Sequence, residues 1–305
     1  MNNEPMTGAD VYSAPPRRRA LVGIGAAAGY LGLYFGIRFA LSLFVTVVFV
    51  LLRSLPDLEM RDDLLSAVYD SIADISFVEI ICSTIAFFAA VWVVGLIRDR
   101  RRPMAEHTGF FRDTGFVRFR PTIIPVLLLL GFSLNLFVSL MFDILPIPDD
   151  LLEDYASQTT LLGETTMLSV LATAIFAPLS EELVFRGMMI SRLRRAMPVW
   201  AAALIPSAIF GLIHGQILWI CYAFLLGLYL SMVCIRAEST AASALLHAAF
   251  NASSFILPFL PIADDAPPSL FYALAAASGA VSVLLTAVLV MLTKKKPTAC
   301  AQEER

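Results

Sequence analysis

The sequence predicts an all-α fold, a polytopic membrane helix bundle with about eight transmembrane helices. Of its 305 residues, 58% are hydrophobic and only 15% are charged, and the mean hydropathy is +0.78. These values lie well outside the range of a soluble globular domain. Apolar runs of about 20 residues, each long enough to cross about 30 Å of hydrocarbon, can be read eight times along the chain. We therefore expect the chain to be embedded in a lipid bilayer.

The predicted spans use nearly the whole chain and leave no room for a separate soluble domain. They are 22–52, 74–97, 121–143, 166–188, 198–215, 216–235, 241–259 and 270–293. Residues 1–19, with several Pro and Asn residues and three consecutive arginines, predict a disordered basic leader, and 297–305 predict a polar tail. We therefore expect a single transmembrane domain over 20–296.

The first apolar run is too long for a signal peptide and is interpreted as a retained span. It is over-long for one crossing and contains Arg38. Two interpretations stay open: Arg38 pairs with Glu79 in the second span, or it marks a helix that starts late.

The charges of the connecting loops predict the orientation. Residues 98–120 hold seven arginines against three acids, whereas 143–164 hold six acids and no Lys or Arg. The positive-inside rule then puts both termini and the 98–120 loop in the cytoplasm. Four phenylalanines lie among the arginines of that loop. Two interpretations stay equally open: the loop lies on anionic lipid, or it is an ordinary cytoplasmic loop.

The fourth span contains the segment APLSEELVFRG, in which two glutamates and an arginine interrupt the apolar sequence. Ionisable groups at membrane depth are costly and mark functional candidates. Glu182 and Arg186 are four residues apart on one helix face, so we expect an ion pair with a mainly structural role. Glu181 lies about 100° around the helix from Glu182 and has no partner in its own helix. Burial disfavours its charged form, which suits a general base.

Polar residues on two further spans are expected at a similar depth. His214 follows Phe210 by four residues, and Asn251 follows His247 by four. Counting about 1.5 Å per residue from the nearest basic group or turn puts Glu181, His214 and His247 roughly 16–24 Å deep. Glu181 with His214 could then polarise a water molecule, while His247 and Asn251 donate hydrogen bonds to an oxyanion. This chemistry is amide hydrolysis inside a membrane.

The ordered segments EELVFR, FGLIH and HAAFN resemble the EExxxR, FxxxH and HxxxN motifs of the CAAX prenyl endopeptidase and bacteriocin-processing (CPBP) family of intramembrane proteases. The resemblance covers a catalytic core of about 166–254. It implies an eight-helix bundle that cleaves a membrane-anchored or amphipathic peptide or protein, in a bacterial plasma membrane. The site residues that it implies are Glu181, Glu182, Arg186, His214, His247 and Asn251.

The resemblance leaves metal dependence open, since a metal-dependent and a glutamate-type mechanism are both attributed to the family. A divalent metal such as zinc, if present, would be held by Glu181, His214 and His247. Two other function classes are kept beside the protease. One is a non-catalytic scaffold or immunity protein that sequesters a peptide. The other is a proton-coupled transporter, which the sequence supports poorly because its halves show no matched broken helices. Nothing in the sequence predicts nucleic-acid binding.

Overall fold

The computed structural model describes residues 16–53, 72–101, 103–104, 107–160, 165–260 and 266–294. The regular structure of these residues is entirely helical. Six of the helices are long and apolar enough to cross a membrane, so the chain is an integral membrane protein. The predicted all-α polytopic bundle is confirmed. Most of the predicted leader, 1–15, and the tail, 297–305, lie outside the described residues.

All eight predicted spans are helical, but two are shorter than predicted. The six long helices are α2 (Pro16–Arg53), α4 (Ile72–Arg100), α6 (Ile124–Ile144), the composite helix Met167–Leu193, α12 (Ile217–Ala237) and α14 (Pro268–Leu292). The fifth and seventh spans form the 14-residue helices α11 (Val199–Leu212) and α13 (Thr240–Ser253). At 1.5 Å per residue each is about 21 Å long, too short for 30 Å of hydrocarbon. The lengths predicted from 198–215 and 241–259 are therefore wrong.

Helix α2 begins at Pro16, so Arg38 lies well inside it. The interpretation that Arg38 marks a late helix start is therefore wrong. The acidic segment before the fourth span, expected to be a loop, contains the helix α7 (Asp149–Thr160).

The composite helix changes its winding along its length. It consists of α8 (Met167–Leu171), η3 (Ala172–Phe176), α9 (Ala177–Glu182), η4 (Leu183–Ile190) and α10 (Ser191–Leu193), of which η3 and η4 are π-helical. Thr166 and Ser169 form a capping box at its start, which satisfies two free N–H groups. Wider π turns inside α-helices are frequent at functional sites, and Glu181 and Glu182 lie in α9 between two of them.

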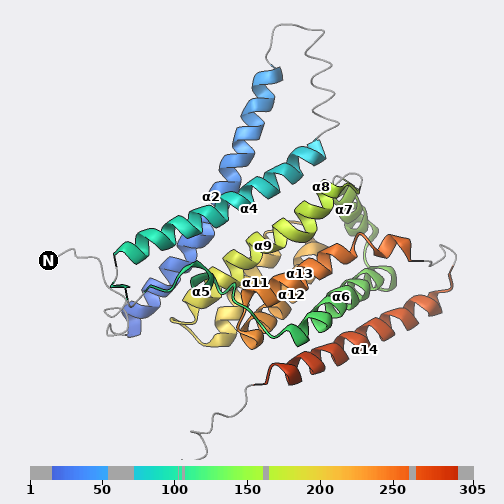
Figure 1. The fold of residues 1–305 in the computed structure, drawn as a ribbon. Helices are drawn as coiled ribbons and strands as arrows, with labels where there is room; N and C mark the ends of the chain where they lie inside the picture. Colours follow the sequence, from blue (N-terminus) through green and yellow to red (C-terminus); the bar gives the residue numbers. More distant parts are fainter. Residues whose placement is uncertain are drawn as a thin grey trace, which may run out of the picture.

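The composite helix lies at the centre of the bundle, beside α11, α12 and α13 (Figure 1). Helices α2 and α4 cover one side, and α6 and α14 cover the other (Figure 1). Leu183 and Met188 are buried in an apolar cluster with α2 and α4. Leu127 and Leu246 belong to a second cluster around α6 and α13. The most polar span is thus the one that protein surrounds most fully.

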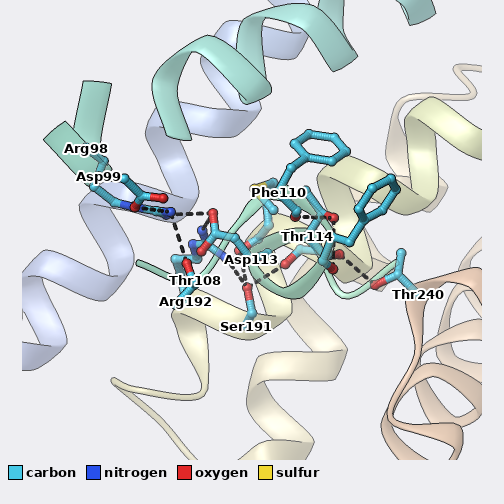
Figure 2. A network of polar contacts seen from close by, with 12 residues as sticks. Arg98, Asp99, Thr108, Phe110, Asp113, Thr114, Ser191, Arg192 and Thr240 are labelled. Atoms are coloured by element: carbon cyan, nitrogen blue, oxygen red, sulfur yellow. Dashed lines mark hydrogen bonds and ion pairs between the residues drawn. The ribbon is translucent and has the colours of Figure 1, made fainter. Parts of the chain in front are cut away.

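The basic segment between α4 and α6 is docked on the end of the bundle (Figure 2). It contains the short helix α5 (Phe110–Thr114). Asp113 accepts ion-pair contacts from Arg98 of α4 at 2.6 Å and from Arg192 of α10 at 2.8 Å. Thr240, at the start of α13, donates a hydrogen bond to the Thr114 carbonyl at 2.9 Å. These contacts join three helices to one short turn.

Three of the four phenylalanines in this segment pack on the protein, and Phe119 does so against the cluster around α6 and α13. The rings of Phe110 and Phe116 pack on Phe88 of α4, at centroid distances of 6.1 and 5.7 Å. Phe111, by contrast, is 67% exposed. Packing on Phe88 thus fixes Phe110 and Phe116 to the bundle, and contact of the loop with anionic lipid stays a prediction.

Candidate active site

A cavity of about 430 Å³ inside the bundle brings together residues from separate helices. Glu181, His214, His247 and Asn251 all line it. They come from α9, the turn after α11, and α13. The cavity thus collects the four residues to which water activation and oxyanion binding were assigned from the sequence.

The ion pair expected from spacing is present. Arg186 Nη1 lies 2.7 Å from Glu182 Oε1, and both side chains are 0% exposed. Arg186 Nη2 also donates to the Gly227 carbonyl of α12 at 2.8 Å. Among the described residues, Glu182 Oε2 and Arg186 Nε have no hydrogen-bond partner. The pair therefore retains unused hydrogen-bonding capacity.

His247 lies between the two glutamates. Its Nδ1 is 3.1 Å from Glu182 Oε1, within hydrogen-bond distance, and its Nε2 is 3.7 Å from Glu181 Oε2. Since a carboxylate only accepts, Nδ1 donates its proton to Glu182, and Nε2 faces Glu181 and the cavity. Glu182 therefore orients a site residue as well as pairing with Arg186. Sequence reasoning missed this role, because no spacing along one helix reports a contact between α9 and α13.

His214 lies in a turn just beyond the end of α11 instead of inside a helix. Its Nδ1 is 2.7 Å from the Phe210 carbonyl oxygen, one of the carbonyls that a helix end leaves without an intrahelical partner. A carbonyl only accepts, so Nδ1 carries the proton and the neutral ring keeps Nε2 free to accept one. Gly215 follows at φ 75°, a left-handed conformation that glycine adopts without strain. The turn thus fixes which nitrogen of His214 is available.

Asn251 is held by a residue that the sequence did not indicate. Its Nδ2 donates a hydrogen bond to the Thr173 carbonyl in the π-helical turn η3, at 2.9 Å. The amide nitrogen has a second N–H, and Asn251 lines the cavity. The contact with η3 therefore leaves one donor for a ligand.

Aromatic residues outside the three motifs shape the cavity. Tyr155 of α7 and Trp219 of α12 line it, with ring centroids 5.9 Å apart. Phe142 packs edge-on against Tyr155 at 5.1 Å. Tyr155 was missed because the acidic segment around it was expected to be a loop, and only tertiary packing brings it to the site.

The predicted metal ligands do not form a metal-binding group. In the part of the chain that the structure describes, no three His, Cys, Asp or Glu side chains converge as a ligand set. Glu181 and His247 approach each other, with Nε2 of His247 3.7 Å from Glu181 Oε2. The Nδ1 atoms of His214 and His247 bond to Phe210 and Glu182, as is common for metal-binding histidines, and this leaves Nε2 of each available. The described residues thus show no preformed zinc site, and the metal dependence of the protein stays open.

Comparison with known proteins locates the similarity in this same region. Residues 163–253 match the family model described as Type II CAAX prenyl endopeptidase Rce1-like. An 86-residue stretch is 38% identical to an uncharacterized 24.3 kDa protein of Escherichia coli, covering 27% of this chain and 40% of that protein. No solved structure matches the chain. The matched segment contains all three motifs and all the cavity residues contributed by α9, α11, α12 and α13. Residues 163–253 are thus similar to the Rce1-like family of CAAX prenyl endopeptidases, as the motifs had indicated.

Proposed function

We propose that the protein is an intramembrane endopeptidase that hydrolyses a peptide bond of a membrane-associated substrate. The observation that supports it best is the convergence of Glu181, His214, His247 and Asn251 on one cavity lined by several helices of the bundle. The Rce1-like match over the same residues supports the reaction class. A bundle interior excludes bulk water, so a few polar groups there can act on a bound amide at low dielectric.

In the proposed mechanism, Glu181 is the general base. Glu181 and the free Nε2 of His214 position a water molecule, and Glu181 takes one proton as the water oxygen attacks the carbonyl carbon. The carbonyl oxygen becomes an oxyanion, which accepts hydrogen bonds from Asn251 Nδ2 and from His247 Nε2. Donation from Nε2 requires that His247 carry protons on both nitrogens, a cation flanked by Glu181 and Glu182. The C–N bond then breaks, and the leaving amine takes the proton from Glu181.

The test is cleavage of membrane-anchored peptides in liposomes, read by mass spectrometry. Glu181→Gln keeps the shape of the side chain but removes the base, so the rate should fall by about 10²–10⁴. Glu79→Gln is a matched control, because Glu79 is a partly buried carboxylate of α4 that does not line the cavity. Wild-type turnover by Glu181→Gln would contradict the mechanism. A wild-type protein that binds such peptides without cutting them would favour the scaffold alternative.

We also propose a bacterial plasma membrane with both termini cytoplasmic, which the charge asymmetry of the loops supports. Cysteine labelling of intact cells at Ser157 and Ala266 should then show exposure on the outer face. Labelling of one position only after permeabilisation would overturn the span count, and the same result at both positions would reverse the orientation.

A further inference from the structure

A second cavity lies against Glu181 and His214 and is built largely by the first helix. It measures about 180 Å³ and is also lined by Tyr34, Phe35 and Arg38 of α2. This helix lies outside the segment that matches the Rce1-like family model. Glu181 and His214 thus separate a large cavity from a small one, and the small one contains a cationic side chain.

The guanidinium of Arg38 is weakly partnered for its position. Arg38 lies inside the apolar span Ala20–Val45 and is half-buried. In the described ranges, its hydrogen bond goes to the Tyr34 hydroxyl at 3.4 Å, a long distance, and its carbon Cζ lies 5.9 Å from that ring's centroid. Glu181 and Glu79 are close enough for their charges to act on it, yet neither forms an ion pair with it among the described residues. The direct Arg38–Glu79 pair considered from the sequence is therefore not observed.

An arginine at membrane depth normally binds an anion or marks a substrate path. Most of the N–H donors of Arg38 remain available, and their planar fork matches a carboxylate. Glu181 lines the same cavity and would repel an anion, so Arg38 is the group there that compensates for this repulsion.

We propose that Arg38 forms a subsite that binds a carboxylate of the peptide substrate next to the bond that is cut. The inference rests on the proposed function, because it takes the bound peptide to be the substrate of the protease. A peptide in the large cavity would present its scissile amide to Glu181 and His214, and its anionic group would enter the small cavity. The carboxylate is either the C-terminus of the peptide or an Asp or Glu side chain.

The experiment measures binding, so that it does not depend on cleavage. Three short apolar peptides have the same sequence, apart from one Asp, and carry N-methylated amides that cannot be cleaved. The first has a free C-terminal carboxylate and the second has a C-terminal amide. The third has the C-terminal amide and a single Asp. Each is titrated against the detergent-solubilised wild type, Arg38→Gln, Arg38→Lys and Arg236→Gln. Arg236 is a matched control, because it lines a different cavity at the end of α12.

The wild type should bind at least one anionic peptide about 10- to 100-fold more tightly than the neutral one, as expected for hydrogen bonds to a charged group. Arg38→Gln should lose this preference while keeping its affinity for the neutral peptide, Arg38→Lys should keep part of it, and Arg236→Gln should keep all of it. Comparison of the two anionic peptides identifies the source of the carboxylate. Equal wild-type affinity for all three peptides would overturn the subsite. An equal loss for charged and neutral peptides in Arg38→Gln would also overturn it, because it would indicate a structural role. If a separate assay found no cleavage, the proposed protease activity would be overturned, but the measured preference for anionic peptides would still hold.

Discussion

Two carboxylate–arginine clusters hold the composite helix, one at its end and one at its centre, and they differ in how fully their polar atoms are used. At the end, Asp113 contacts both Arg98 and Arg192, and Arg192 also donates to the Asp113 carbonyl at 3.0 Å (Figure 2). At the centre, Glu182 pairs with Arg186, and each retains one atom without a partner among the described residues. Among the described residues, the cluster at the end leaves no buried polar side-chain atom without a hydrogen-bond partner, whereas the central cluster leaves two.

This difference distinguishes the Asp113 cluster, which joins helices, from the Glu182 cluster, which reaches the candidate active site. The Asp113 carboxyl is 12% exposed and is surrounded by the basic groups that fix α5 to α4 and α10. The Glu182 carboxylate is fully buried and uses Oε1 for two contacts, with Arg186 and with His247. Through His247 the central cluster reaches the cavity and Glu181. We therefore expect the central pair, which contacts His247 beside the cavity, to affect chemistry, and the Asp113 cluster to affect stability.

The largest expected effect is on the central pair. Glu182→Gln leaves the Arg186 guanidinium buried without its counter-charge, and breaking such a pair costs about 3–5 kcal/mol. The protein should unfold at a clearly lower temperature in detergent, whereas Glu181→Gln, the neighbouring control, should unfold near the wild-type temperature. A Glu182→Gln protein that is stable but inactive would show that the roles of the two glutamates are reversed.

A smaller effect is expected at the oxyanion donors. Asn251→Ala should lower turnover by about 10²–10³ with little change in stability, because the lost hydrogen bond acts on the transition state. His247→Ala should lower turnover too, and it should also lower stability because it removes the contact with Glu182. Turnover and thermal unfolding of both variants distinguish these outcomes. Unchanged turnover in Asn251→Ala would remove it from the mechanism.

The cluster around Asp113 should affect stability alone. Asp113→Asn removes the charge that Arg98 and Arg192 share, and we expect a loss of about 1–3 kcal/mol with unchanged turnover per folded molecule. Asp99→Asn is the control, because among the described residues Asp99 pairs with Arg98 alone, and its loss leaves Arg98 paired with Asp113. If Asp113→Asn lowered turnover of the folded protein, the distinction between the two clusters would fail.

The smallest effect is the pH dependence of that cluster. Burial by itself would raise the pKa of Asp113, but the charges of Arg192 and Arg98 and their hydrogen bonds outweigh it and hold the pKa below its ordinary value of 3.8. At a pH between the two values the unfolded chain binds more protons, so stability rises with pH. The stabilisation by Asp113 is present above pH 3.8 and is lost as the pH falls from there through the lowered pKa. The stability difference between wild type and Asp113→Asn, measured by unfolding from pH 6 down to about pH 3, should shrink only at the acid end. A constant difference would contradict the assignment.

Contacts along one helix could be predicted from the sequence. The apolar runs predict the helices because only a helix satisfies the backbone in lipid. The four-residue spacing predicted the Glu182–Arg186 pair, since residues i and i+4 lie on one face of an α-helix. Glu181, His214, His247 and Asn251 could be selected because polar groups in apolar spans are rare enough to be noticed one at a time. Their roles in catalysis stay predictions.

Contacts between helices were decided only by the tertiary structure. The bond from His247 to Glu182, the bond from Asn251 to Thr173, and the position of Tyr155 depend on how α13, η3 and α7 pack. The sequence determined which residues are too polar to face lipid. It did not determine which of them meet, because the rotation and depth of each helix are set by its neighbours. For this reason the sequence identified Arg38 only as a charged residue inside an apolar span. The tertiary structure places it beside Glu181 and His214.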